Sequence, residues 1–511
     1  MHASAAVYAL CVAFLSPPQR PLLPTTTNSL SYITPPRLRC GGALRMVFSD
    51  VERRAAYPSS TNSFKSSDFL LDRYLGAVGV ITIRDWAYYD ETTGEKVSPN
   101  PFDPRSPRQT TDESSAMVRL FQARLIPTGL PGYPVLLKEY ATDARHLAET
   151  ELDIYGEIIE DYNARKGLSE KAVSFPPVVP GLGRVEADPY LGTNEFQEQW
   201  KRQVAFRNVP PPRPGNIWTV LQWPGPLTFD TYDRLGRGER DDVLDGVVPG
   251  FRLKRKSRFL KMAIRRALEA IDYLHQLRIV HRSISPGSFV LQDANEREPL
   301  NVKVLIQDFG FATTLQRLAR SDDDDSVRRA MKVGAVTPAA ILDYLKAEDL
   351  KSSCVTFLYF IVANLYDEAA AKRGQGKGGS DTGNKRMELT PGGFRQTSPR
   401  SFLAVRRLVE EVFDGDMSGL RDYWLNDEPF ADVVKFLDQN DMAGWDFLSR
   451  LYKAPQLFQQ QVKDTQQRGG EREISGDGGK GEVTERERVY WNARDLQEHP
   501  FLGGSGSGSR T

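Results

Sequence analysis

The stretch RIVHRSISPGSFVL, residues 278–291, lies between two strongly patterned segments of this 511-residue chain. Before it, residues 258–279 have apolar positions at helical spacing, which predicts a long amphipathic helix leading into the stretch. After it, DFG occurs at residues 308–310, and residues 350–366 are apolar over a length typical of a helix buried in a large domain. The sequence therefore predicts a short polar loop inside a largely helical region.

The chain before residue 224 has the pattern of β-strands. Clustered or alternating apolar and β-branched residues predict strands at 69–84, 116–127, 133–140 and 216–224. A helical period interrupts them, with an apolar stripe made of Leu147, Ile154, Tyr155, Ile158 and Tyr162. Because strands come first and helices follow, the sequence predicts an α+β fold with two unequal lobes rather than alternating βαβ units.

The composition is that of an ordinary globular protein, with 40% hydrophobic and 26% charged residues. Lys plus Arg and Asp plus Glu both number 67, so no overall field attracts nucleic acid or an anionic membrane. We therefore expect no nucleic-acid partner. Cys11, Cys40 and Cys354 lie too far apart to suggest a metal site or a disulfide framework.

The amino terminus has the composition of a targeting sequence. Residues 5–15, AAVYALCVAFL, match the length of a secretory apolar core, which is too short to span a bilayer. From Leu15 to Ser49 the chain has no acidic residue but several arginines among Ser, Thr and Pro, as in an organelle transit peptide. This order resembles the bipartite presequences of algae with secondary plastids. It implies that residues 1–45 are a signal plus transit peptide, that the protein resides in the chloroplast stroma, and that the mature chain has no transmembrane segment. A secreted protein stays the alternative.

Several segments lack periodicity and are rich in Gly, Pro, Ser or charged residues. Such composition predicts disorder. The predicted disordered segments are a linker at 46–67, insertions near 90–115, 368–398 and 464–487, and a tail at 503–511.

Four landmarks, in this order, resemble those of the protein kinase superfamily. VLLK ends at Lys138, HRSISPGS spans 281–288, DFG spans 308–310 and EHPFL ends at Leu502. The resemblance covers the chain from about Phe69 to Leu502. It implies a bilobal protein kinase-like domain at 68–502, with a small β-rich N-lobe at about 68–223 and a larger helical C-lobe at about 224–502.

In this family a lysine, a glutamate and a metal-binding aspartate organise ATP and Mg²⁺. The resemblance places Lys138 at the lysine and Asp308 at the metal ligand. Counting 100° per residue puts Glu151 on the apolar stripe of the helix, where a carboxylate needs a partner, so Glu151 is the predicted partner of Lys138 and Glu157 the fallback.

The remaining nucleotide contacts also come from the resemblance. Gly76 and Gly79, in LGAVGVI at 75–81, stand for the glycine-rich loop over the phosphates. Gln222 and Trp223, after the last apolar strand, stand for the segment that contacts the adenine.

Two further residues concern the loop and its regulation. Arg282 matches the arginine that pairs with a phosphate in the activation segment, where this chain has SDDDDS at 321–326; the acidic run is either a substitute for that phosphate or a solvated loop. Asp349 matches the aspartate that braces the catalytic loop, and a helix N-cap is its alternative.

The departures from the family pattern concentrate on catalysis. Ser283 replaces the aspartate that accepts the substrate proton, Ser285 replaces a lysine, and Ser288 replaces the second metal ligand with a weaker hydroxyl. Val78 stands at the second glycine of the loop, where a branched side chain hinders close approach of phosphates.

These departures favour a pseudokinase of the plastid that acts as a regulatory or scaffolding module on a protein partner, with ATP and Mg²⁺ as candidate ligands. The alternative is an active Ser/Thr protein kinase with an atypical catalytic loop. The sequence leaves open whether the chain is an enzyme.

Overall fold

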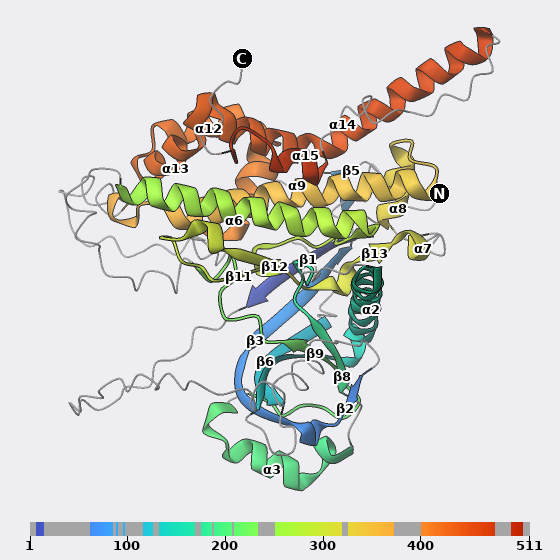
Figure 1. Ribbon diagram of the computed structural model, residues 1–511, viewed down its shortest axis with the longest axis vertical. Coiled ribbons are helices and arrows are strands. Elements are labelled where there is room, and N and C mark those ends of the chain that lie inside the picture. The colour runs from blue at the N-terminus through green and yellow to red at the C-terminus, as the bar shows by residue number, and fades with distance from the viewer. Residues whose placement is uncertain are drawn as a thin grey trace.

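The computed structural model describes residues 7–14, 62–84, 88–89, 96–97, 116–125, 132–168, 175–185, 189–206, 209–232, 251–318, 325–371, 400–475 and 492–503. Within these residues the fold is mixed α+β, as predicted. The main sheet and helix α2 (Arg145–Leu168) occupy the lower part of the molecule in Figure 1, and most of the other helices occupy the upper part.

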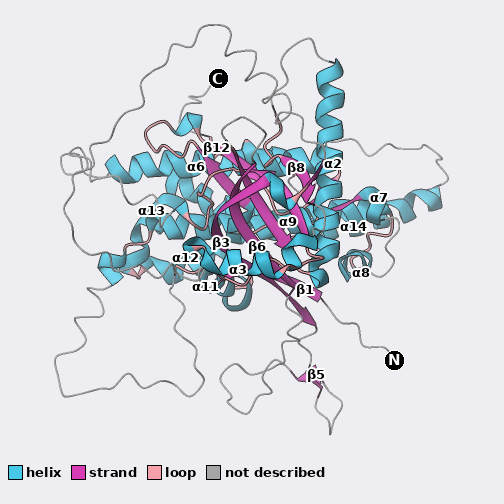
Figure 2. Cartoon of the chain, turned by 90° about the horizontal axis from the view of Figure 1, so that it is seen from below, coloured by secondary structure: helices cyan, strands magenta, loops and turns pink. Residues whose placement is uncertain are grey.

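The main sheet has seven strands in the order β1-β3-β6-β7-β9-β8-β2. Neighbouring strands are antiparallel except for β2 and β8, which are parallel. Viewed from below, strands β3 and β6 cross the centre of the molecule with helices around them (Figure 2). The strand bounds are β1 Val7–Phe14, β2 Ser63–Phe64, β3 Phe69–Arg84, β6 Ala116–Leu125, β7 Tyr133–Tyr140, β8 Gly181–Val185 and β9 Ile217–Gln222.

Aromatic side chains fill the space beside the lower end of the sheet. Phe121 of β6 stacks on Trp218 of β9, with ring centroids 5.4 Å apart, and Trp200 stacks on Phe206 at 4.4 Å. Trp200 belongs to α3 (Asn194–Arg202), the helix below the sheet in Figure 1. Strand β7 is buried on both faces from Val135 to Tyr140, so a charged side chain on this part of the strand needs a partner inside the protein.

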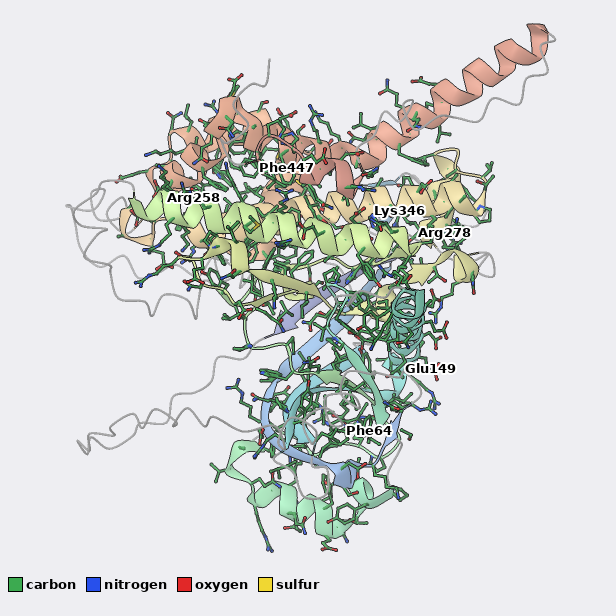
Figure 3. All side chains as sticks on the ribbon, in the orientation of Figure 1. Phe64, Glu149, Arg258, Arg278, Lys346 and Phe447 are labelled. Carbon is green, nitrogen blue, oxygen red and sulfur yellow. The ribbon has the colours of Figure 1, made fainter. Side chains whose placement is uncertain are left out.

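The helices of the upper part pack around α9, which is almost entirely buried. Phe360 of α9 stacks on Phe229 with ring centroids 3.9 Å apart, and Phe447 of α14 belongs to the same core (Figure 3). The helix bounds are α6 Phe251–Gln276, α7 Leu315–Leu318, α8 Asp325–Lys332, α9 Pro338–Leu365, α11 Phe402–Arg407, α12 Met417–Leu425, α13 Ala431–Leu437, α14 Gln439–Ser475 and α15 Ala493–Gln497.

Small two-stranded ladders border the polar loop at 281–288. One pairs β10 with β13 and another pairs β11 with β12; a third, β4 with β5, lies elsewhere. Their bounds are β4 Tyr88–Tyr89, β5 Lys96–Val97, β10 Ile279–Val280, β11 Phe289–Gln292, β12 Lys303–Ile306 and β13 Thr313–Thr314.

The structure confirms the predicted strands and long helices and corrects three boundaries. Ser63–Phe64 form strand β2 paired with β8, so the predicted linker 46–67 is wrong from residue 62 onward. Residues 464–475 continue α14, because the Gln, Arg and Glu residues of this segment favour a helix despite its two glycines. Tyr88–Tyr89 and Lys96–Val97 pair at the start of the predicted 90–115 insertion.

Other boundary predictions lie mostly or wholly outside the described residues. These are the insertion near 368–398, of which only residues 368–371 are described and are helical, residues 476–487, the tail after residue 503 and most of the presequence. Of the presequence, the described Val7–Phe14 pair with Ala77–Arg84 of β3. Removal of residues 1–45 stays a prediction.

No helix among the described residues is both long and apolar enough to cross a membrane.

We predict that Phe360→Ala lowers the free energy of unfolding by about 3–5 kcal/mol, because the truncation leaves a cavity beside Phe229 in the core. Urea unfolding followed by circular dichroism measures the loss. Leu403→Ala is the control, since this side chain is 44% exposed and its truncation opens no internal cavity. Equal losses for the two variants would contradict the assignment of α9 to the core.

Candidate functional site

The predicted Lys138, Glu151 and Asp308 come together in one buried ion-pair cluster. The Nζ atom of Lys138 lies 2.6 Å from Oε1 of Glu151 and 2.7 Å from Oδ1 of Asp308. Lys138 comes from β7, Glu151 from α2, and Asp308 from the turn after β12. Glu151 is fully buried, whereas the Asp308 side chain is 44% exposed. One ammonium group therefore links three segments far apart in the sequence, and one end of the cluster reaches solvent.

The stripe argument chose the correct glutamate: Glu151 pairs with Lys138, and Glu157 does not. The sequence reasoning missed two hydroxyl groups that hold the same carboxylate. Tyr140 donates to Oε2 of Glu151 at 2.5 Å, and Thr219 donates to it at 3.2 Å. Tyr140 lies two residues after Lys138 and therefore on the same face of β7. The two-residue period of a strand indicates this from the sequence alone. Thr219 lies opposite Lys138 in the β7–β9 register, which the sequence alone does not give.

The electrostatics keep Lys138 charged. Burial would lower the pKa of Lys138, but the Asp308 and Glu151 carboxylates outweigh it and raise that pKa above its ordinary value. Burial, with the Glu151 carboxylate beside it, raises the pKa of Tyr140 well above its ordinary value. Lys138 thus stays an ammonium group and Tyr140 a neutral hydrogen-bond donor at neutral pH.

Asp308 reaches Lys138 because of an unusual backbone conformation. Its φ of 73° and ψ of 58° are left-handed, a region that aspartate visits more readily than most residues. The next residue, Phe309, is fully buried, with its ring 5.2 Å from that of Tyr155 and 5.5 Å from that of His281. The packed phenylalanine anchors the turn and directs the Asp308 carboxylate toward Lys138.

Asp349 braces the loop that begins at His281, as predicted. Its Oδ2 accepts from the backbone N–H of His281 at 2.8 Å, and its Oδ1 accepts from that of Arg282 at 2.7 Å. His275 Nε2 lies 3.2 Å from Oδ2. The alternative reading of Asp349 as a helix N-cap is wrong, because the residue lies in the middle of α9. A buried carboxylate thus fixes two consecutive peptide groups of the loop.

Three serines of the loop, Ser283, Ser285 and Ser288, bond to one another. Ser288 Oγ donates to the carbonyl of Ser283 at 3.3 Å and accepts from the backbone N–H of Ser285 at 3.1 Å. The carbonyl of Ser288 accepts from the N–H of Gln307, which joins the loop to the residue before Asp308. The loop therefore lies beside the ion-pair cluster, while the Ser288 hydroxyl, only 1% exposed, is used within it.

The glycine-rich loop predicted at 75–81 is wrong as a loop. Gly76 and Gly79 lie inside the continuous strand β3, opposite Leu120 and Met117 of β6. Val78, Val80 and Ile81 favour an extended chain, and the connection to β6 comes only after Arg84. Gly76 has a φ of 146° and lies next to a register shift between β3 and β6. Its backbone conformation therefore accommodates an irregularity within the strand and does not form a turn. Contact of these glycines with a nucleotide stays a prediction.

Gln222 is the last residue of strand β9 and Trp223 follows it, but their backbone donors are already used. The N–H of Gln222 donates to the carbonyl of Pro180 at 2.9 Å, and that of Trp223 donates to the carbonyl of Pro134 at 3.2 Å. An adenine contact at these two residues would therefore need their carbonyls or side chains.

Arg282 has a left-handed φ of 64°, and its Nη2 donates to Oγ of Ser326 at 2.8 Å. Ser326 is the last residue of the acidic stretch 321–326, most of which lies outside the described residues. The structure thus brings Arg282 to this segment without testing the role of its aspartates.

The described residues contain no group of three or more His, Cys, Asp or Glu side chains arranged to hold a metal ion. Asp308 is the carboxylate available for a metal, and its oxygen contacts Lys138. Magnesium usually binds through one or two carboxylates, water and the substrate phosphates, so a single carboxylate suits a metal that arrives with a nucleotide. Metal binding by Asp308 and Ser288 stays a prediction.

We predict that Asp349→Ala lowers the free energy of unfolding by about 2–6 kcal/mol, because each of the two buried N–H donors it leaves costs about 1–3 kcal/mol. Urea unfolding measures the change. Asp343→Ala is a matched control on the same helix, since this carboxylate is 43% exposed and pairs only with Lys346 at 3.1 Å in the described contacts. The control should lose less than about 1 kcal/mol. A loss for Asp349→Ala as small as that of the control would show that the brace contributes nothing.

No protein-family model matches the chain, and no curated protein matches it. The geometry of the Lys138 cluster and the neighbouring loop is therefore the basis for a functional proposal.

Proposed function

We propose that residues 68–502 form a bilobal protein kinase-like domain with a nucleotide pocket at Lys138 and a catalytically degenerate loop. The observation that carries this proposal is the Lys138 ammonium held between Glu151 and Asp308. The chain would act as a pseudokinase, a regulatory or scaffolding module that binds a protein partner. The presequence composition supports a chloroplast location for this role.

The cluster has the charges that ATP with Mg²⁺ would need. Lys138 keeps its positive charge and is fixed in position, so it can neutralise phosphate oxygens without losing side-chain freedom on binding. Asp308 lies at the solvent end of the cluster, where a metal carried by the nucleotide would reach its carboxylate. When bound, Mg²⁺ would supply charge neutralisation at the phosphates.

The loop at residues 281–288 contains no carboxylate that could accept a proton. Ser283 stands where a general base would be, and a hydroxyl is too weak a base at neutral pH to replace a carboxylate. General-base catalysis contributes roughly 10²–10⁴ in rate, so its loss slows phosphoryl transfer without abolishing it. The Ser288 hydroxyl, used inside the loop, weakens a second metal position as well. Together these features favour binding over catalysis.

A slow Ser/Thr protein kinase is the second candidate. It is favoured by the intact ion-pair cluster and by the brace from Asp349, which together hold the loop beside the pocket. In this case the positioned phosphates and the electrostatics would supply the catalysis that remains without a base.

We predict that ATP with Mg²⁺ stabilises residues 46–511 against heat. At 100 times the Kd, the linkage relation gives about 2.7 kcal/mol of stabilisation. Lys138→Ala should abolish the effect, and Asp308→Asn should abolish its dependence on Mg²⁺. A thermal-shift titration with ATP, with and without Mg²⁺, measures all three.

Lys201→Ala is the control for loss of a lysine, because Lys201 forms an exposed ion pair with Glu198 on α3. This variant should respond to ATP like the unaltered chain. Absence of any shift at millimolar ATP would refute the nucleotide pocket and leave a kinase-like fold used only as a binding surface.

We predict that Ser283→Asp raises ATP-dependent phosphorylation of a generic protein substrate by about tenfold or more if the chain is a slow kinase. Transfer of radiolabelled phosphate measures the rate. Ser285→Asp, in the same loop but two residues away, controls for the added charge. An unchanged, undetectable rate for Ser283→Asp would refute the slow-kinase reading.

A further inference from the structure

A proline-rich segment lies between α3 and β9 in the chain. Its sequence is VPPPRP over residues 209–214, and these residues belong to no helix or strand. A proline ring fixes its own φ near about −65° and pushes the residue before it toward an extended conformation. Because four of the six residues are prolines, the segment favours a polyproline II helix, which has three residues per turn.

The exposure of the segment follows this three-residue period. Pro212 is buried, whereas Pro210 and Arg213, which share one edge of such a helix, are both exposed. On another edge, Pro211 is half-buried and Pro214 is exposed. One edge therefore faces the protein, and the other two edges are available to a partner.

A buried ion pair holds the inner side of the segment. Nη2 of Arg119, on β6, lies 2.5 Å from Oε2 of Glu139, on β7, and the two side chains are only 9% and 1% exposed. Arg119 donates to the carbonyl of Pro210 at 2.5 Å and to that of Pro211 at 3.3 Å. Oε1 of Glu139 accepts from the backbone N–H of Arg213 at 3.2 Å. The backbone is thus fixed before any partner arrives, so binding costs little conformational entropy.

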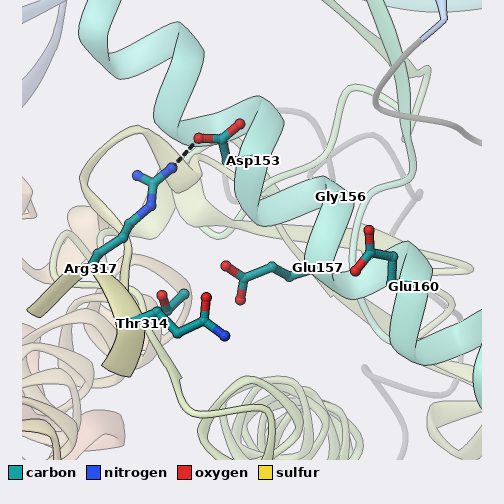
Figure 4. Close-up of a pocket in the computed structure, with 7 residues that line it drawn as sticks. Asp153, Gly156, Glu157, Glu160, Thr314 and Arg317 are labelled. Carbon is teal, nitrogen blue, oxygen red and sulfur yellow. Dashed lines mark hydrogen bonds and ion pairs between the residues drawn. The ribbon is translucent and has the colours of Figure 1, made fainter. Parts of the chain in front are cut away.

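The Arg213 guanidinium group is available for a partner. Its side chain forms no ion pair or hydrogen bond with the described residues, and only its peptide N–H is bound, to Glu139. Arg317, in contrast, is already paired with Asp153 of α2 (Figure 4). An exposed arginine beside exposed prolines therefore presents a charge and apolar rings on one surface.

We propose that residues 210–214 dock in the aromatic groove of a partner protein that recognises polyproline II segments, with an acidic group of that partner on Arg213. Such grooves pack proline rings against aromatic side chains and bind the P-x-x-P spacing, which Pro211 and Pro214 provide here. The proposal names the kind of partner for the scaffolding role and in that respect rests on the proposed function. The segment and the pocket are nevertheless separate, because Glu139 and Lys138 are consecutive on β7 and point to opposite faces of the strand.

The test uses a purified SH3 domain that binds P-x-x-P peptides containing arginine, and isothermal titration calorimetry measures its affinity for the full chain. A peptide with the sequence of residues 208–216, NVPPPRPGN, is the reference ligand. The folded chain should bind the domain at least as tightly as the peptide, because its segment is held in place before binding. Binding of the peptide without binding of the folded chain would show that the protein itself closes the segment and would overturn the proposal. Binding of neither would overturn the choice of a polyproline groove as the partner.

Three variants locate the binding. Arg213→Ala should weaken it by about tenfold, because the variant loses the charge but keeps the peptide N–H bound to Glu139. Pro214→Ala should also weaken it, since it removes an exposed ring from the docking edge. Arg258→Ala removes an exposed arginine of α6 (Figure 3) and should change the affinity by less than about twofold.

Equal effects of Arg213→Ala and Arg258→Ala would place the domain elsewhere on the chain and overturn the proposal. ATP takes no part in this titration. Failure of the docking test therefore leaves the nucleotide pocket in place, and absence of a thermal shift with ATP leaves the docking segment in place.

Discussion

The Lys138 ammonium group is the interaction on which the rest of the site depends. Its side chain is only 2% exposed. Its two carboxylate partners, Glu151 on α2 and Asp308 in the turn after β12, belong to segments that no other described ion pair connects. Removing one partner of a buried ion pair leaves an uncompensated charge and typically costs about 3–5 kcal/mol. The pair therefore fixes which strand, helix and turn lie together, even though its net contribution to stability is small.

The neutral donors around Glu151 strengthen this constraint. The carboxylate receives Lys138 on one oxygen and the hydroxyl groups of Tyr140 and Thr219 on the other. All three come from the central strands β7 and β9, so the Glu151 side chain bonds α2 to two strands of the sheet. Asp349 makes a similar connection in the helical part, where it ties α9 to the loop at His281 and Arg282. Two buried carboxylates thus position the cluster and the loop relative to the elements that carry them.

The sequence predicted what local periodicity and short motifs encode. The apolar stripe identified Glu151, and the order of the motifs placed Lys138, Asp308 and Asp349. What it missed depends on the pairing of distant strands: Thr219 reaches Glu151 only because β9 pairs with β7 in one register, and Ser63–Phe64 form a strand only because β8 lies beside them. The predicted glycine-rich loop is wrong because the motif outweighed the local strand propensity in the prediction. The β-branched neighbours of Gly76 and Gly79 favour the continuous strand that forms.

Two features of the site bear differently on the proposed function. Lys138 and its carboxylates form a positioned charge cluster, whereas Ser283 stands where a kinase would have a base. If the proposal holds, this combination suits a site that binds a ligand without a chemical step. The ion pair between Lys138 and Asp308 closes the site without any ligand, so a nucleotide would have to compete for both groups. Binding would then move the turn that carries Asp308 and Phe309, and Phe309 packs on Tyr155 of α2. A ligand at this site would therefore act on the position of α2.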